Sequence, residues 1–373
     1  MARPAAALAA GALAVLLGAA LAQEPTPKKG QDPASDQAKP KDAPPKGRTR
    51  GGLRAPGGAA PKKGLRKDTN ALPPAGNPGA AAGEPQHYTF KLSVTKGPPL
   101  AATYYPSKLG TNAAVVLLIH EKNRSTRDFQ EPIADLKKKG LAETLQADGY
   151  AVLAIDLPGQ GANPRRELAD RDWRGMVDDL QTAYKFLVDR HNRGELNLAR
   201  LGVVGVGEGA NLAAVWAASP GAAVTGEGRT SDVGALVLVS PMSDDQAVGL
   251  RAGAALTALA PRAPILILAG ERDAATTNLL NAARPIVERA RQNQINVFPT
   301  SLHGYKLLWL EPKAASAIGK FLEGTTKFRA QEWEPRYNLQ PATYSDIRPV
   351  TSPPPTPIVD PARPEAPEKK DQS

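Results

Sequence analysis

The chain of 373 residues contains no cysteine and has few aromatic residues, which make up 5% of it. The absence of cysteine excludes a disulfide framework and any zinc site built on thiolates. Histidine is also scarce: its four residues show no His-x-x-x-His spacing, so we expect no metal site. Without disulfides, the protein has to be stabilised by its hydrophobic core, which favours one large domain over a small cross-linked scaffold.

Proline and glycine are abundant, with 36 and 34 residues, but they are unevenly distributed. Residues 23–86 are rich in Pro, Gly and Lys and have almost no large apolar residues, which predicts a disordered linker. Residues 331–373 are predicted to be a Pro-rich C-terminal tail, whose aromatic first part can pack back on the domain. The remaining residues, 87–330, have the length of a single domain.

The first 22 residues have the layout of a signal peptide. Arg3 precedes a long apolar run that ends in Ala20-Leu21-Ala22, a small-x-small cleavage pattern before Gln23. We therefore expect export to the periplasm, the envelope or the extracellular space. The alternative is an uncleaved membrane anchor, because the run approaches the length of a membrane-spanning helix.

The formal net charge of +10 is concentrated in the predicted linker, which contains twelve Lys and Arg against six Asp and Glu. Such a basic segment can attract an anionic polymer or a membrane surface. The alternative is a solvated linker whose charge keeps it soluble. Export, and the lack of aromatic residues between the charges, argue against nucleic acid as a partner.

Apolar runs and segments of helical period alternate between the predicted tails. Strands are predicted at residues 87–94, 100–106, 113–120, 201–206, 234–241, 264–270 and 295–299. Residues 150–161 are predicted to be a further strand that leads into a Gly/Pro turn. The last segment, 306–324, is predicted to be a single terminal helix. This alternation indicates an α/β protein with a doubly wound, mostly parallel sheet, to which the first two strands add an antiparallel hairpin. We expect the functional residues at the carboxyl ends of the parallel strands.

One glycine-rich turn has the spacing of a nucleophile motif. Gly205-Val206-Gly207-Glu208-Gly209 follows a predicted buried strand and precedes a predicted helix, as G-x-S-x-G does. The central residue of that motif is the nucleophile, and here it is Gly207. The position therefore has no side chain that could attack a carbonyl.

Five segments, in this order, resemble the α/β-hydrolase family and its dienelactone-hydrolase-like branch most closely. They are LLIHEKNRS, GYAVLAIDLPGQG, LGVVGVGEGANLA, ILILAGERDAAT and SLHGYKLL. The resemblance covers about residues 86–327. It implies the α/β-hydrolase fold and a nucleophile, an acid and a base in that chain order.

The resemblance places the acid at Asp273 and the base at His303, both vestigial if the nucleophile position is Gly207. Asp273 is also well suited to cap the helix that follows it. For His303 the alternative is a loop residue that binds a backbone carbonyl.

The same resemblance assigns an oxyanion loop to Glu121, Lys122 and Glu208. A carboxylate at Glu208 opposes the negative charge that develops in acyl transfer. Glu208 is a poor candidate nucleophile, since it belongs to the start of the helix, where it can stabilise the helix dipole. For Glu121 and the preceding His120, the alternative is a strand-end pair that binds neighbouring loops.

A relocated nucleophile is the remaining route to a standard hydrolase. Ser240 and Ser243 follow the next predicted strand, and Asp244 or Asp245 could serve as an acid there. No oxyanion-binding group is aimed at either serine in the family pattern.

A nucleotide cofactor is not expected. Gly205, Gly207 and Ala210 fit a loose G-x-G-x-x-A pattern, but no acidic residue ends the next strand and several strands come before this one. A P-loop is excluded because the turn lacks its lysine. We therefore expect neither a cofactor nor a metal.

These observations favour an exported α/β-hydrolase-fold protein that is a degenerate hydrolase, acting as a binding or structural module. Only about twenty residues separate the strands at 234–241 and 264–270, so no large lid covers the site, which could hold a small ester-like or carbohydrate-like ligand. The alternative is an active esterase or dienelactone hydrolase on small esters, with a relocated nucleophile or with water activated by His303. A third hypothesis places the function in the tails, with the domain as a spacer.

Overall fold

The computed structural model describes residues 86–164, 169–219, 231–244, 246–247, 249–337 and 339–351. The predicted signal peptide 1–22, nearly all of the predicted linker 23–86 and the end of the predicted C-terminal tail lie outside these residues. Within them, no helix combines the length and the apolar character needed to cross a membrane.

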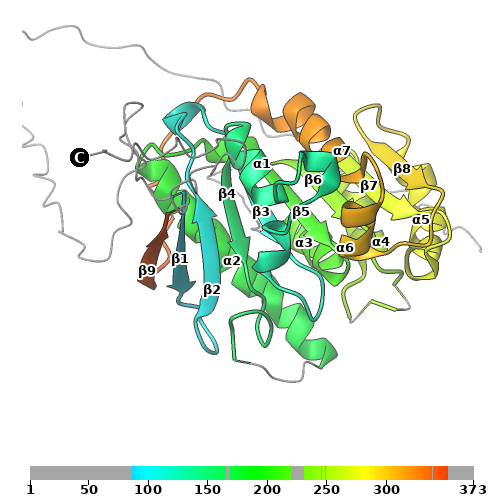
Figure 1. The fold of residues 1–373 in the computed structure, drawn as a ribbon, viewed down its shortest axis with the longest axis horizontal. Helices are drawn as coiled ribbons and strands as arrows, with labels where there is room; N and C mark the ends of the chain where they lie inside the picture. The colour runs from blue at the N-terminus through cyan, green and yellow to red at the C-terminus, as the bar shows by residue number, and fades with distance from the viewer. Residues whose placement is uncertain are drawn as a thin grey trace, which may run out of the picture. The chain divides into compact units, whose positions relative to one another are not determined.

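The described residues form nine strands, seven α-helices and a few single helical turns (Figure 1). The strands are β1 (His87–Leu92), β2 (Leu100–Tyr105), β3 (Val115–Ile119), β4 (Ala151–Ile155), β5 (Leu201–Val206), β6 (Val233–Val239), β7 (Ile265–Gly270), β8 (Gln294–Phe298) and β9 (Tyr344–Val350). The helices are α1 (Leu141–Ala147), α2 (Asp170–Asn192), α3 (Glu208–Ala218), α4 (Ala252–Leu259), α5 (Ala274–Val287), α6 (Gly304–Leu310) and α7 (Ala314–Leu322). The 3-10 turns are η1 (Gly110–Asn112), η2 (Thr126–Phe129), η3 (Ala134–Leu136) and η4 (Leu198–Arg200), and η5 (Glu323–Lys327) is a π-helical turn.

The strands form one sheet in the order β8-β7-β6-β5-β3-β4-β2-β1-β9. The six strands from β8 to β4 are parallel, whereas β2, β1 and β9 are antiparallel to their neighbours. The predicted α/β class, with a doubly wound and mostly parallel sheet, is confirmed, and so is the leading hairpin.

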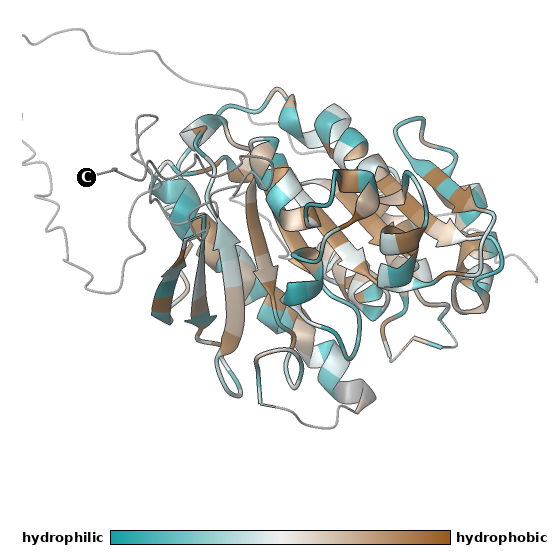
Figure 2. Cartoon of the chain, in the orientation of Figure 1, coloured by the Kyte–Doolittle hydropathy of each residue, from teal (hydrophilic) through white to brown (hydrophobic). Residues whose placement is uncertain are grey.

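The apolar runs form the buried centre of the sheet. Every residue of β3, β4, β5, β6 and β7 is buried, as expected for parallel strands that helices cover on both faces. Figure 2 shows these strands as the most hydrophobic part of the ribbon. Side chains from α2 to α5 complete the core on one face, and those from α1, α6 and α7 complete it on the other.

The predicted terminal helix over 306–324 is wrong in one respect, because two helices occupy this segment. Helix α6 ends at Leu310, and α7 begins at Ala314. Between them, Glu311 has an extended backbone with φ −90° and ψ 117°. Pro312 is the cause, since the ring of a proline disfavours the helical conformation of the residue before it.

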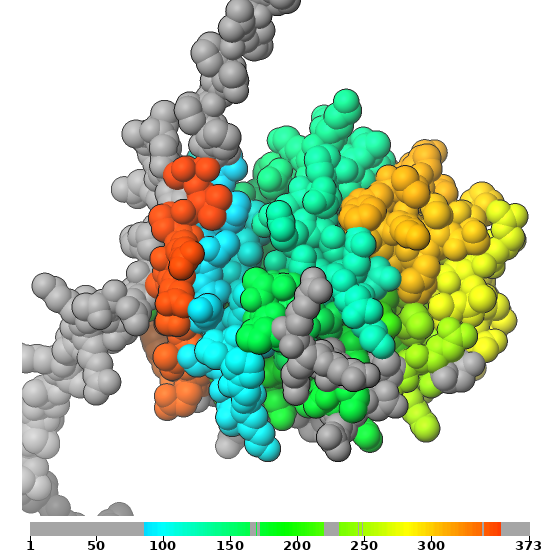
Figure 3. Space-filling model, turned by 60° about the horizontal axis from the view of Figure 1, so that its bottom comes forward, coloured from blue at the N-terminus to red at the C-terminus, as the bar shows by residue number. Residues whose placement is uncertain are grey.

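A strand also forms within the segment predicted as the C-terminal tail. Strand β9 pairs with β1 in antiparallel register, with Leu92 opposite Tyr344. Figure 3 shows this segment lying along the hairpin of β1 and β2 at the edge of the domain. The Tyr344 ring is buried against Phe90 and Phe186, with ring centroids 5.8 and 5.3 Å away. This part of the tail therefore completes the edge of the sheet.

Candidate active site

Four parallel strands bring the predicted site residues to one edge of the sheet. Glu121 follows β3, Gly207 follows β5, Asp273 follows β7 and His303 follows β8. These are the carboxyl ends of the strands, where α/β sheets place their functional residues.

The turn at Gly207 joins β5 directly to α3. Its backbone has φ 56° and ψ −126°, in the region that glycine adopts without the strain of a Cβ atom. Its N–H donates to the carbonyl of Val239, 2.9 Å away, which anchors the turn to the end of β6. The sharp strand-to-helix turn that the motif predicts is therefore present, with a glycine at its centre.

Asp273 and His303 are in direct contact. The Nδ1 atom of His303 donates to Oδ2 of Asp273 at 2.8 Å. Asp273 also caps α5, since its carboxylate accepts from the backbone N–H of Ala275 at 3.2 Å and from the Thr276 hydroxyl at 2.7 Å. The Asp273 carboxylate therefore caps the helix and binds His303 at the same time.

The charges around this pair favour an ionic form. Burial lowers the pKa of His303, but the hydrogen bond to Asp273 and the negative charges of Asp273, Glu121 and Glu208 outweigh burial and raise that pKa above its ordinary value. Burial raises the pKa of Asp273, but its hydrogen bonds with His303 and Thr276 lower that pKa overall. Both shifts favour the charged forms, which strengthen a hydrogen bond of this kind, and the His303 side chain stays 26% exposed.

The Glu121 side chain lies between the Gly207 turn and the turn at Gly304. A Cβ atom added at Gly207 would lie 2.7 Å from Cγ of Glu121, and one added at Gly304 would lie 2.1 Å from its Oε2. Oε2 accepts from the backbone N–H of Tyr305 at 3.1 Å. Glycine at both turns therefore makes room for one carboxylate.

Burial raises the pKa of the Glu121 carboxyl above its ordinary value, and the nearby charge of Glu208 adds to this. The N–H of Tyr305 and the charge of His303 oppose the shift but do not cancel it. The carboxyl therefore stands at the centre of the site, close enough to influence the titration of His303.

Glu208 places a second carboxylate in the same region. Its Oε2 accepts from the backbone N–H of Lys122 at 3.2 Å. The resemblance assigns Lys122 and Glu208 to the oxyanion loop, whose task is to donate hydrogen bonds to a developing negative charge. Here the Lys122 donor is already bonded to a carboxylate of the chain itself.

His120 acts as a strand-end residue. Its ring is buried, with Nδ1 donating to the carbonyl of Glu121 at 2.7 Å and Nε2 accepting from the N–H of Leu157 at 2.9 Å. Burial is the main cause that lowers its pKa. His120 thus holds the backbone from which the Glu121 side chain projects.

The two serines considered as relocated nucleophiles are fully buried. Ser240 has a positive φ of 47°, and its hydroxyl has no hydrogen-bond partner among the described residues. The Ser243 hydroxyl accepts from the N–H of Leu279 at 3.2 Å. Asp244 accepts from the N–H of Gly253 at 3.3 Å, while Asp245 lies outside the described residues. Among the residues that the structure describes, no group of three or more His, Asp and Glu is arranged to hold a metal.

The sequence predicts Glu121 in a loop after a strand but does not indicate where its side chain lies. That position depends on the close approach of the turns after β5 and β8, which are about a hundred residues apart in the chain. The contact of Asp273 with Thr276 could have been found, since Asp followed by Thr three residues later suits the first turn of a helix.

The fold and the order of these residues define the class of protein as one with the α/β-hydrolase fold. Residues 110–260 match the family model described as serine aminopeptidase, S33. The resemblance to the α/β-hydrolases drawn from the sequence is confirmed by this match and by the sheet. No curated protein matches the chain.

Several solved structures are similar to this chain. An esterase from Pyrococcus furiosus is 16% identical, with a TM-score of 0.48 over 67% of this chain and 97% of its own. A dienelactone hydrolase from Anabaena variabilis is 20% identical, with a TM-score of 0.41 over 65% of this chain and 96% of its own. An acylaminoacyl peptidase from Pyrococcus horikoshii is 14% identical, with a TM-score of 0.46 over 68% of this chain and 43% of its own.

Proposed function

We propose that this chain is an exported, degenerate hydrolase, which uses an α/β-hydrolase fold as a binding or structural module and does not turn over esters by a covalent route. The proposal rests on one observation. At the strand-to-helix turn, Gly207 offers no nucleophile, and the space beside it is filled by the side chain of Glu121.

Two requirements of acyl transfer are missing together. A covalent route needs an attacking atom that a base can deprotonate, and Gly207 has no such atom. The route also needs free donors for the developing oxyanion, but the N–H of Lys122 is bonded to the Glu208 carboxylate. A carbonyl oxygen at this position would meet a negative charge in place of a donor.

The remaining polar groups suit recognition better than turnover. Asp273 and His303 form a hydrogen-bonded pair whose imidazole is partly exposed. Such a site would accept a small ester-like or carbohydrate-like ligand, the class that the sequence predicts.

Export and tethering belong to the same proposal. The signal-like segment 1–22 would direct the chain out of the cytoplasm. The basic residues 23–86 would hold the domain near an anionic polymer or a membrane surface by electrostatic attraction. Equal retention on anionic vesicles with and without residues 23–86 would remove this part of the proposal.

The central experiment is an ester assay on the chain lacking residues 1–22, with p-nitrophenyl acetate and butyrate as substrates. We expect the wild type and His303→Ala to show the same background rate. We expect Gly207→Ser to show activity when Glu121→Ala makes room for the serine and Glu208→Ala frees the N–H of Lys122, and a further His303→Ala change should abolish that activity. Gly207→Ala in the same background is the matched control, because it adds the same Cβ atom without the hydroxyl.

A second candidate function is an active esterase that uses Asp273 and His303 to activate water. The intact 2.8 Å hydrogen bond of this pair favours it. Its signature would be wild-type ester hydrolysis that disappears in His303→Ala. That result would overturn the proposal that the chain is a degenerate hydrolase. Hydrolysis that disappears only in Ser240→Ala would point to a relocated nucleophile.

A further inference from the structure

The first and last described residues lie next to each other at one corner of the sheet. The N–H of Gln86 donates to the carbonyl of Val350 at 2.8 Å, and His87 lies opposite Val350 in the register of β1 and β9. Residues 1–85 and 352–373, which lie outside the described part of the chain, therefore join the domain at the same place.

This corner belongs to the edge at which the parallel strands begin, which we call the starting edge. The ring centroid of His87 is 4.8 Å from that of Tyr105, and Tyr105 pairs with Val152 near the start of β4. The candidate active site lies at the opposite edge, where the parallel strands end. The two points of attachment and the candidate site are therefore on opposite sides of the domain.

Two large apolar side chains are exposed on the starting edge. Leu109, 50% exposed, precedes the turn η1, and Phe328, 72% exposed, follows the turn η5. Both lie beside the residues before β4: a Cβ atom added at Gly149 would lie 2.7 Å from Cδ1 of Leu109, and Nζ of Lys327 lies 5.8 Å from the ring centroid of Tyr150 and 5.9 Å from that of Phe328. Figure 1 shows the turn before β3 and the end of α7 on the same side of the domain.

Cations are distributed along the whole starting edge. Lys108 precedes η1, and Arg200 ends η4 just before β5. Arg262 precedes β7, and Arg289 and Arg291 precede β8. All of these except Arg200 are exposed, and none of the exposed four is within ion-pair distance of a carboxylate in the part of the chain that the structure describes. The starting edge thus presents free positive charge to the solvent.

The acidic residues of the starting edge are fewer, and two of them are already paired. Glu323 lies 3.8 Å from Nζ of Lys327, and Glu288 lies 3.0 Å from Nη1 of Arg284. The others are Asp148, Glu332 and Glu334. The starting edge is therefore basic overall, whereas three carboxylates surround the single imidazole of the candidate site.

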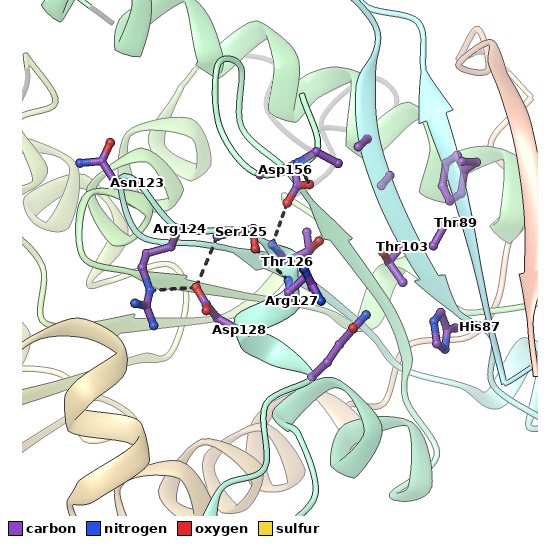
Figure 4. Close-up of a pocket in the computed structure, with 16 residues that line it drawn as sticks. His87, Thr89, Thr103, Asn123, Arg124, Ser125, Thr126, Arg127, Asp128 and Asp156 are labelled. Atoms are coloured by element: carbon purple, nitrogen blue, oxygen red, sulfur yellow. Dashed lines mark hydrogen bonds and ion pairs between the residues drawn. The ribbon is translucent and has the colours of Figure 1, made fainter. Parts of the chain in front are cut away.

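The opposite side of the domain matches its charges internally. The cavity beside the loop of residues 123–128 has a volume of about 570 Å³ and is lined by Asp156, which follows β4. Figure 4 shows Arg124 paired with Asp128, and Asp156 bonded to the N–H of Thr126. An anionic surface would therefore gain most from contact with the starting edge.

The spread of the cations fits an extended anionic surface better than a small ligand. Lys108 precedes β3 and Arg291 precedes β8, with β5, β6 and β7 between these strands in the sheet. Neighbouring strands are about 4.8 Å apart, so the cations span about 20 Å. A bilayer with anionic headgroups offers charge over that distance, and its interface accepts apolar side chains such as Phe328 and Leu109.

We propose that the domain docks on an anionic lipid bilayer through its starting edge, with Phe328 and Leu109 in the interface and the candidate active site facing away from the membrane. The proposal rests on the membrane tethering proposed above, and it assigns a second contact to the folded domain itself. It does not depend on whether the chain hydrolyses esters.

The first test is sedimentation of the chain lacking residues 1–22 with vesicles. We expect binding to vesicles that contain phosphatidylglycerol and much weaker binding to phosphatidylcholine alone. Phe328→Ser combined with Leu109→Ser should weaken binding to the anionic vesicles by about tenfold or more, because it removes the apolar contact. The matched control is Leu310→Ser on α6, which removes a side chain that is 64% exposed and should bind as the wild type does.

Charge reversal provides a second test. Arg289→Glu combined with Arg291→Glu should weaken binding by about tenfold or more, since lipid charge acts on cations within about 10 Å at 0.1 M salt. Lys139→Glu combined with Lys306→Glu is the matched control, because it makes the same change in net charge next to α1 and α6, away from the starting edge. It should weaken binding by less than about threefold.

The absence of cysteine allows the orientation to be measured directly. Thr111→Cys introduces a single thiol on η1, and Ser301→Cys introduces one beside His303, both at exposed positions. A polarity-sensitive dye attached at position 111 should shift its emission to shorter wavelength on anionic vesicles, whereas the dye at position 301 should not. The reverse pattern would overturn the proposed orientation.

The remaining outcomes separate docking from tethering. If the wild type does not bind anionic vesicles, both proposals fail. If it binds, but the Phe328 and Arg289 variants bind equally well and only deletion of residues 23–86 removes binding, docking fails and tethering stands. Binding to soluble heparin without binding to vesicles, or self-association that Phe328→Ser abolishes without vesicle binding, would likewise overturn docking on a membrane. None of these results affects the ester assay.

Discussion

Cγ of Glu121 lies 2.7 Å from the point where a Cβ atom at Gly207 would stand. Cβ atoms in proteins do not approach other carbons so closely, so the two positions cannot both carry an unmoved side chain. The glycine at the centre of the turn and the glutamate after β3 are therefore coupled, although 86 residues separate them.

This coupling predicts a non-additive effect on stability. Gly207→Ala should lower the free energy of unfolding by about 2 kcal/mol or more, because it adds both a strained positive φ and an overlap with Glu121. In a Glu121→Ala background the overlap is relieved, and the same change should cost less. Urea unfolding of the four members of this cycle measures the difference. An equal cost in both backgrounds would show that the two side chains do not compete for space.

The pair of Asp273 and His303 predicts a pH-dependent contribution to stability. The pKa of His303 is raised in the folded state, so its contribution is complete below the ordinary value of 6.5 and is lost as the pH rises through the raised pKa. The pKa of Asp273 is lowered, so its contribution is present above the ordinary value of 3.8 and is lost as the pH falls through the lowered pKa.

The variant Asp273→Asn tests this, because asparagine still caps a helix but carries no charge. The difference in unfolding free energy between wild type and Asp273→Asn should be largest between about pH 4 and pH 6.5, and smaller at pH 9. A difference that stays constant from pH 5.5 to pH 9 would mean that the ionic form of the pair does not contribute.

His120 is predicted to remain neutral in the folded protein, with its proton on Nδ1. Burial lowers its pKa, and Nε2 is committed as the acceptor for the N–H of Leu157. Unfolding restores an ordinary pKa near 6.5, so this histidine stabilises the protein above that pH and the effect is lost as the pH falls. Nitrogen NMR shifts of the imidazole rings between pH 8 and pH 5 measure this. A His120 ring that titrates above pH 6.5 would contradict the assignment.

Two contacts of β9 should contribute very different amounts to the free energy of unfolding. The Tyr344 hydroxyl accepts from the buried guanidinium of Arg190 at 2.6 Å, beside Asp189 and Glu195. Tyr344→Phe should therefore lower the free energy of unfolding by about 1–3 kcal/mol, because it leaves a buried charged group with one partner fewer.

The matched surface contact is the ion pair of Lys91 with Asp346, 2.8 Å long with both side chains about half exposed. Lys91→Met should change the free energy of unfolding by about 1 kcal/mol at most, since water and ions screen exposed pairs. Thermal or urea unfolding of both variants provides the comparison. If Lys91→Met lowered the free energy of unfolding more than Tyr344→Phe does, the exposed ion pair would stabilise β9 more than its buried hydrogen bond.

Much of the architecture could be read from local patterns. Continuous apolar runs such as residues 115–119 identify strands that are covered on both faces, and their alternation with helices leaves few topologies other than a parallel sheet. The resemblance to the α/β-hydrolases placed Asp273 and His303 after two of these strands, and the structure joins them by a hydrogen bond. Pro312 carried the information that divides the last helical segment, but the helical period around it concealed this.

The rest was decided by the tertiary structure, because it depends on residues that are distant in the chain. Periodicity cannot show that the Glu121 side chain fills the space beside Gly207, that Glu208 bonds the N–H of Lys122, or that Tyr344 reaches Arg190. The sequence by itself determined the fold class and placed Gly207, Asp273 and His303 after strands of the sheet. Only the packing of separate strand ends against one another decided that carboxylates of the chain itself occupy the centre of that site, since close approach and burial arise when the sheet is assembled.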